Sequence, residues 1–342
     1  MLRRWRRGGT AVAEPEPYEE FEGTTEELLA EVERLSEANR AAADPSTEAR
    51  LLTLRHLAGI RLMDAAPEDP AHPQPAADRL PQTDGLPDIA RADLDRELLR
   101  AGILRDGCLL VRGLVARDAA LAFADGIERA FRERERGDAA AAGWYEEFEP
   151  HPRFGPVNER PWIKEGGGVL AIDSPTLSFE LRELLESAGV PRLVAGYLGE
   201  PPLTSVQKTT LRKAEPTVPG AWHQDGAFMG DVRSLNLWLA LSRCGDEAPG
   251  LDVVPRRLDA FAATGTDEAV LSYQVSQRAA EEAAGGIEIV RPVFEPGDAL
   301  FFDEMCLHQT ASDPSMPNPR FAIENWFFGG SAFPREFFPL AV

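Results

Sequence analysis

The chain has 342 residues, of which 43% are hydrophobic and 27% are charged, so it is long and apolar enough to bury a sizeable core. Asp and Glu number 57 against 36 Lys and Arg, which gives a formal net charge of −21. A field of that sign repels phosphate backbones and anionic lipid, so we expect no nucleic-acid partner and no binding to a membrane surface.

The cysteine content argues against an extracellular scaffold. Cys108, Cys244 and Cys306 are too few and too scattered for a disulfide framework or a cysteine-based zinc site. No stretch of about 18 apolar residues occurs, so no transmembrane helix is expected. These features together predict a soluble, cytoplasmic protein.

The first part of the chain is predicted to be helical behind a mobile tail. Residues 1–23 combine a basic tip with acidic residues and prolines, which is typical of a tail. Thr24 and Glu27 have capping-box spacing for one helix, and a second helical run covers about 46–64. Prolines through 66–88 predict an extended linker.

We therefore expect residues 24–90 to form a helical extension with its linker, and residues 91–342 to form the main domain. This domain begins with a buried strand at Cys108–Arg112 and a helix over about 116–136. Residues 143–172 are rich in Gly, Pro and aromatic residues, as expected of a long binding loop.

Two helices follow, at Ser174–Ser187 and about 190–198, and then only strand-like segments. These segments are 203–213, 233–242, 251–254, 287–294, 299–303 and 320–328. Helices first and strands later, without βαβ alternation, predict an α+β fold with a β-barrel or jelly-roll core braced by helices.

Two histidines and an aspartate are candidate metal ligands. His223 and Asp225 are two residues apart, so an extended chain points both side chains to the same side. His308 comes at the end of a predicted buried strand. Two His and one carboxylate on one face of a metal leave positions open for co-substrates, as non-haem Fe(II) oxygenases require. Zinc hydrolases use the same ligand types, so these residues alone do not decide the metal.

Arg320 is a candidate anchor for a carboxylate. It opens an otherwise apolar strand, which we expect to run beside the strand that carries His308. A guanidinium in this position can bind the remote end of a dicarboxylate bidentately while the near end chelates the metal. Thr310 lies two residues past His308 and can donate its hydroxyl to the same carboxylate. The alternative for Arg320 is an ordinary surface arginine.

The order of these motifs resembles the phytanoyl-CoA dioxygenase family of Fe(II)/2-oxoglutarate oxygenases. The resemblance covers roughly residues 100–333 and rests on Trp222-His-Gln-Asp-Gly226, Leu235-Asn-Leu-Trp-Leu-Ala-Leu241, Gly250-Leu-Asp-Val-Val-Pro255, Gly297-Asp-Ala-Leu-Phe-Phe302, His308 and Arg320. It implies a cupin-like double-stranded β-helix core. It also implies Fe(II), 2-oxoglutarate and O2 as cofactor and co-substrates.

The resemblance further implies roles for individual residues. His223, Asp225 and His308 would bind the iron, while Arg320 and Thr310 would hold the C5 carboxylate of 2-oxoglutarate. Trp238 and Gln207 resemble residues of the co-substrate wall, and for Trp238 simple core packing is the alternative. The turn after Pro255 departs from the Gly-Ser-His turn that is frequent in the family, because it reads Arg256-Arg257.

The expected reaction is hydroxylation of an unactivated C–H bond of a small molecule, with release of succinate and CO2, as in tailoring of secondary metabolites. Related halogenases replace the carboxylate ligand with a small residue, so Asp225 favours oxygen chemistry. Desaturation, epoxidation and epimerisation use the same iron centre and stay open. A non-oxidative metal-dependent hydrolase or isomerase, or a catalytically silent binding protein, is the alternative of another class. The sequence does not indicate an oligomeric state.

Overall fold

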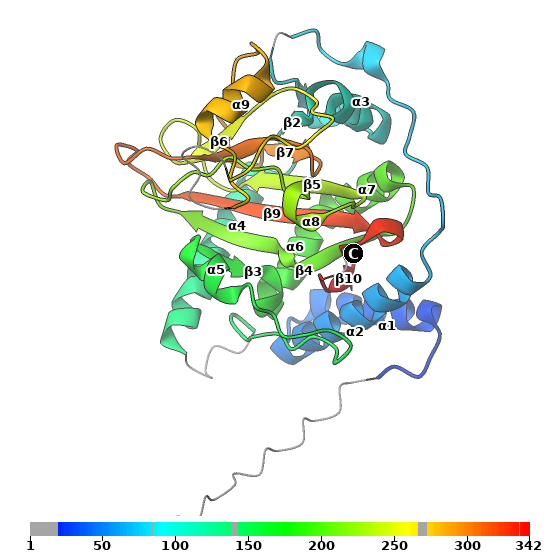
Figure 1. Ribbon diagram of the computed structural model, residues 1–342. Helices are drawn as coiled ribbons and strands as arrows, with labels where there is room; N and C mark the ends of the chain where they lie inside the picture. The colour runs from blue at the N-terminus through cyan, green and yellow to red at the C-terminus, as the bar shows by residue number, and fades with distance from the viewer. Residues whose placement is uncertain (1–19, 84, 138–142, 266–271, 335) are drawn as a thin grey trace, which may run out of the picture.

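The core is built from one large and one small β-sheet (Figure 1). The computed structural model describes residues 20–83, 85–137, 143–265, 272–334 and 336–342. The large sheet has the strand order β1 (Asp88–Ala90), β2 (Cys108–Arg112), β7 (Ala299–Phe302), β5 (Ser234–Ala240), β9 (Arg320–Gly329), β4 (Pro202–Ala214) and β10 (Pro339–Ala341), with β3 (Gly168–Leu170) also paired to β4. The small sheet pairs β6 (Gly250–Val253) with β8 (His308–Ala311).

Successive side chains of β5 point to opposite faces of the large sheet, so the sheet contributes residues to two hydrophobic cores. Leu235 and Leu237 pack into a core under the helices, whereas Trp238 and Ala240 pack into a second core on the opposite face. Leu251 of the small sheet belongs to this second core. The second core therefore lies between the two sheets, which is the α+β jelly-roll arrangement predicted from the order of elements.

Four helices cover the outer face of the large sheet. They are α3 (Arg96–Asp106), α4 (Arg117–Arg136), α6 (Pro175–Ser187) and α7 (Val190–Leu198). Their apolar residues, among them Leu99, Ile127 and Leu181, share the first core with the β5 leucines. Burial of this one apolar face holds the helices on the sheet.

The helical extension packs on the jelly roll. The capping box of Thr24 and Glu27 forms at the start of α1 (Thr25–Ala41), and α1 packs on α2 (Pro45–Asp64). α2 in turn contacts β10 and α6. Most of the predicted tail, residues 1–19, lies outside the described residues. The next residues are tied down, because Arg61 donates hydrogen bonds to the carbonyls of Phe21 and Gly23.

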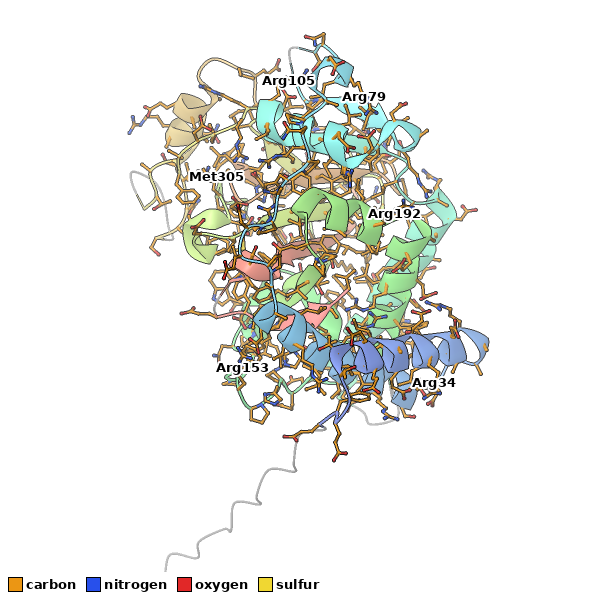
Figure 2. The ribbon with its side chains drawn as sticks, turned by 90° about the vertical axis from the view of Figure 1, so that its right-hand side faces the viewer. Arg34, Arg79, Arg105, Arg153, Arg192 and Met305 are labelled. Atoms are coloured by element: carbon orange, nitrogen blue, oxygen red, sulfur yellow. The ribbon has the colours of Figure 1, made fainter. Side chains whose placement is uncertain are left out.

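The proline-rich segment runs along one flank, from α2 at the base of Figure 1 to α3 at the top, and crosses the front of the molecule in Figure 2. It leads into β1, so the first strand of the large sheet begins at Asp88. None of the described helices is long and apolar enough to span a bilayer.

Several local predictions are wrong. Residues 287–294 do not form a strand and make only isolated bridges, through Val290 and Phe294, because Pro292 has no N–H to donate to a ladder. The 143–172 segment is not one long loop, since it contains α5 (Arg160–Glu165) and β3. Two short helices, α8 (Gly226–Met229) and α9 (Gln277–Ala284), were not expected.

Candidate active site

The structure brings His223, Asp225 and His308 together at one edge of the small sheet. His223 and His308 form an antiparallel bridge in which each backbone N–H donates to the carbonyl of the other, over 3.0 and 3.1 Å. Their ring centroids are 4.5 Å apart. A doubly hydrogen-bonded pair holds two side chains on the same side of a sheet. The sequence predicted an extended chain from His223 through Asp225. In the structure Asp225 instead has a helical backbone conformation and directly precedes the first turn of α8.

One oxygen of Asp225 faces both imidazoles. Asp225 Oδ2 lies 3.9 Å from Nε2 of His223 and 3.8 Å from Nε2 of His308, beyond hydrogen-bond distance. One donor atom from each of the three residues lies within 4.8 Å of the other two. Three donors that converge in this way without bonding one another fit a metal ion between them.

The second nitrogen of each imidazole is already engaged. Nδ1 of His223 lies 2.7 Å from the carbonyl oxygen of Ala221, and Nδ1 of His308 lies 3.1 Å from that of Cys306. Since a carbonyl oxygen only accepts, each Nδ1 carries the proton and donates it. Each Nε2 then presents a lone pair toward Asp225, which is the tautomer that binds a metal.

Lys208 holds the other oxygen of Asp225 and was not found from the sequence. Its Nζ donates to Asp225 Oδ1 over 2.7 Å. Burial alone would raise the pKa of Asp225, but the positive charge of Lys208 and its hydrogen bond oppose burial, and the pKa is lowered to about 2. Asp225 is therefore a carboxylate at neutral pH and is available as an anionic ligand.

Lys208 reaches the site from an irregular part of β4. The β4–β9 register shifts between Thr204 and Thr209, so extra residues of β4 bulge out of the ladder. Gln207, the predicted co-substrate contact on this strand, binds elsewhere. Its Oε1 accepts from the backbone N–H of Phe338 over 3.0 Å, and its contact with the co-substrate stays a prediction.

Gln224, between the two ligands of the Trp222–Gly226 motif, fixes the segment from behind. Its Nε2 donates to the carbonyl of Met305 over 2.8 Å, and its Oε1 accepts from the N–H of Ala262 over 2.7 Å. The buried amide therefore anchors the ligand segment to two loops.

Arg320 is buried between the sheets and not on the surface, with 2% of its area exposed. Its Nη1 donates to the carbonyl of Gly250 over 3.0 Å, and its guanidinium lies 5.3 Å from the centre of the Trp238 ring. Its strand β9 pairs with β4 and β5, not with the strand of His308 as predicted, because β8 belongs to the opposite sheet. Arg320 thus reaches across from one sheet to the other.

Two buried N–H groups at this place have no partner among the described residues: Nε of Arg320 and Nε1 of Trp238. Glu324 does not pair with Arg320, since its carboxylate is bound by Thr210 over 2.8 Å and Arg212 over 3.3 Å. A buried donor without an acceptor is costly, and a charged one more so. The pair therefore fits an anionic ligand.

Thr310 of β8 lies close to the backbone of β6 to which Arg320 is bound. It is opposite Leu251 in the β6–β8 register, one residue from the Gly250 carbonyl that Arg320 binds. It is half-buried and lies two residues past His308 on the same strand. The structure thus connects Thr310 to both His308 and Arg320 through one short sheet.

On the other side of the histidine pair, His223 lies beside a row of three aromatic rings, two of which are exposed. Phe228 of α8 stacks at 6.3 Å from His223, and Tyr273 lies 5.8 Å from Phe228. Trp162 of α5 lies 5.9 Å from Tyr273 and is 61% exposed, while Phe228 is 45% exposed. We call these three rings, Trp162, Phe228 and Tyr273, the aromatic rim.

The jelly roll with its His–Asp–His cluster and buried arginine defines a non-haem iron oxygenase of the 2-oxoglutarate-dependent class. The chain belongs to the phytanoyl-CoA dioxygenase family, whose profile matches residues 103–316. The donor set of the cluster fits the iron of that class, and the unpartnered N–H groups fit its keto-acid co-substrate. A search of curated proteins finds no match.

Solved structures are similar over most of the chain at low identity. EctD from S. alaskensis, solved with 2-oxoglutarate and 5-hydroxyectoine, is 15% identical with a TM-score of 0.49, covering 77% of this chain and 86% of its own. AviO1 from Streptomyces viridochromogenes Tue57 is 21% identical with a TM-score of 0.46, covering 70% and 98%. The carbocyclase SnoK from nogalamycin biosynthesis is 15% identical with a TM-score of 0.45, covering 70% and 85%.

Proposed function

We propose that this enzyme hydroxylates an unactivated C–H bond of a small, largely apolar molecule, with 2-oxoglutarate and O2 as co-substrates. The observation that carries the proposal is the pair of Nε2 atoms, one from each histidine, that face one carboxylate oxygen of Asp225. When bound there, ferrous iron with 2-oxoglutarate and O2 supplies an oxidant able to attack such a bond, with succinate and CO2 as co-products.

One group of residues would bind the iron, and a second group would bind 2-oxoglutarate. His223, Asp225 and His308 would hold the iron, and Lys208 would keep Asp225 ionised and oriented. Arg320 would bind the remote carboxylate of 2-oxoglutarate, with Thr310 donating its hydroxyl to the same group. Trp238 would donate its Nε1–H to the co-substrate beside Arg320 and pack its ring against it. Trp238 would then be a wall of the co-substrate site and a packed core residue at once.

The aromatic rim supports the choice of substrate. The co-substrate side, with Arg320 and Trp238, is buried, so the substrate would enter past the exposed ring of Phe228 and the half-buried ring of Tyr273. Aromatic rings favour flat or apolar groups and bury large areas on contact. The rim would also exclude water from the reacting carbon once a substrate covers it.

The experiment that tests the proposal measures O2 uptake and succinate release with Fe(II), 2-oxoglutarate and candidate ring-containing substrates. We expect both to require iron and to rise when an accepted substrate is added, with a product 16 mass units heavier than the substrate (one oxygen atom). His223→Ala should abolish both signals. Turnover of a substrate without O2 or 2-oxoglutarate would instead support a hydrolase or isomerase.

A further inference from the structure

A cavity lies on the far side of the large sheet from the histidine cluster. It has a volume of about 260 Å³ and is enclosed by α1, α2, α6 and the outer face of β4 and β9. This volume approaches the roughly 300 Å³ at which small-molecule sites begin. In Figure 1 the helical pair lies below β4 and β10, at the base of the molecule.

Three arginines line this cavity, Arg40 of α1, Arg55 of α2 and Arg182 of α6, together with three glutamates. Arg40 pairs with two of these glutamates, which leaves Arg55 and Arg182 as the arginines of interest. Among the described residues neither has a carboxylate within salt-bridge distance, and Nε of Arg182 is buried without a hydrogen-bond partner. Burial lowers the pKa of Arg55 to about 10. Burial also lowers the pKa of Arg182, and the neighbouring charge of Arg55 lowers it further. Two like charges of this kind are costly without a counter-ion.

The nearby carboxylates do not satisfy the pair. Glu33 and Glu183 are both bound by Arg40, over 2.9 and 2.8 Å. Together with Glu186 they act on Arg55 only at longer range, and they reduce the positive charge that the cavity presents. This partial compensation favours a ligand with a single negative charge over a dianion.

The floor and the walls of the cavity differ in polarity. The floor is formed by β4 and β9 and includes Thr204, Thr209 and Asn325, whose Nδ2 is a further buried donor without a partner. Leu181, Leu185 and Phe327 are apolar lining residues. Thr209 already donates its hydroxyl to the Ser205 carbonyl, so the amide of Asn325 is the donor that the floor offers. This donor beside an apolar wall suits a ligand with an anionic head and a short hydrocarbon tail.

We propose that this cavity is a binding site for a small monocarboxylate with a short apolar tail, held by Arg55 and Arg182. The site is separate from the iron site, because β4 and β9 lie between them. It joins the helical extension to the jelly roll, so its ligand would stabilise their contact.

The test measures binding of hexanoate to metal-free protein by calorimetry and by thermal shift, without 2-oxoglutarate. We expect wild-type protein to bind hexanoate more tightly than acetate, and Arg182→Met to weaken hexanoate binding at least tenfold. Arg34→Met is the matched control, since Arg34 of α1 is exposed and pairs with Glu31 (labelled in Figure 2). Its affinity for hexanoate should equal that of the wild type.

Two further measurements keep the proposal open to refutation. Without ligand, Arg182→Met should be at least as stable as the wild type, because it removes an unpaired buried charge; Arg55→Met serves if Arg182→Met fails to fold. Arg320→Gln should leave hexanoate binding intact. The proposal is overturned if hexanoate does not bind, if inorganic phosphate binds in its place, or if binding survives in Arg182→Met and Arg55→Met but is lost in Arg320→Gln.

Discussion

Lys208 and Asp225 form a buried ion pair in which Nζ lies 2.7 Å from Oδ1, so the lysine occupies the carboxylate oxygen that does not face the histidines. The side chain of Lys208 also lies 4.4 Å from the centre of the Phe228 ring, which restricts its movement. Asp225 is thereby held with Oδ2 toward both Nε2 atoms before any metal binds.

We predict that Lys208→Met weakens binding of Fe(II) about 10- to 100-fold, as loss of a partner that orients a ligand typically does. The methionine keeps much of the side-chain volume, so the fold should be retained. Anaerobic titration with Fe(II) measures the effect. Lys213→Met is the control, because Lys213 also forms an ion pair, with Glu128 of α4, but lies away from the cluster. Equal losses in both variants would argue against the role of Lys208.

We predict that Arg320→Gln mainly weakens binding of 2-oxoglutarate. Loss of a charge-assisted hydrogen bond costs about 1.5–3 kcal/mol, or roughly 10- to 150-fold in affinity. The KM for 2-oxoglutarate in succinate release should rise accordingly, while the affinity for Fe(II) stays the same. Arg212→Gln is the matched control, since Arg212 pairs with Glu324 on the same sheet. An unchanged KM in Arg320→Gln would refute the assigned role.

The fold was predictable from sequence where local pattern and burial agree. The capping box at Thr24, the leucines of β5 and the order of helices before strands all have direct physical signals, and the structure contains these elements. The strand expected at 287–294 was wrong because Pro292 has no N–H to donate to a ladder and because Ile287 and Val293 are exposed instead of packed in a sheet.

The candidate site was only partly predictable, because long-range pairing decides it. The His-x-Asp spacing and the later His308 carry a signal in the chain itself. The sequence around Lys208 gives no such signal, apart from the fact that the chain has only three lysines. A β-bulge brings Lys208 to Asp225, and no local motif indicates that bulge.

Acidification should destabilise the contact between α2 and β10 through His56. His56 is fully buried, its Nδ1 donates to the Pro339 carbonyl over 2.7 Å, and its Nε2 accepts from the N–H of His151 over 3.1 Å. Burial is the main cause that lowers its pKa to about 4. An unfolded histidine titrates near 6.5, so the unfolded chain binds more protons between these values, and stability falls as the pH falls from about 6.5 to 4.

The expected loss from this residue between pH 7 and pH 5 is about 2 kcal/mol in the free energy of unfolding. Urea denaturation at both pH values measures it. His56→Gln keeps hydrogen-bonding capacity but cannot titrate, so its stability should depend less on pH than that of the wild type. A variant with the wild-type pH dependence would show that other groups cause the loss.

Gly59 lets α2 approach β10 closely. A Cβ at this position would lie 2.8 Å from the carbonyl carbon of Pro339 and 2.9 Å from Cα of Leu340, and backbone atoms cannot move aside easily. Gly59→Ala should therefore destabilise the protein by about 1–3 kcal/mol, although alanine favours helix. Gly155→Ala is the control, because a Cβ there meets no atom within 4 Å. Thermal denaturation compares the two variants, and equal melting temperatures would contradict the packing argument.

The most direct measurement is an anaerobic spectroscopic titration of the protein with Fe(II) followed by 2-oxoglutarate. Binding of both at the His223–Asp225–His308 cluster should produce a weak visible charge-transfer band that saturates at one iron per chain and changes when a substrate is added. His308→Ala should remove the band. A band of unchanged intensity in His308→Ala and Asp225→Ala would contradict the assignment of the iron to this cluster.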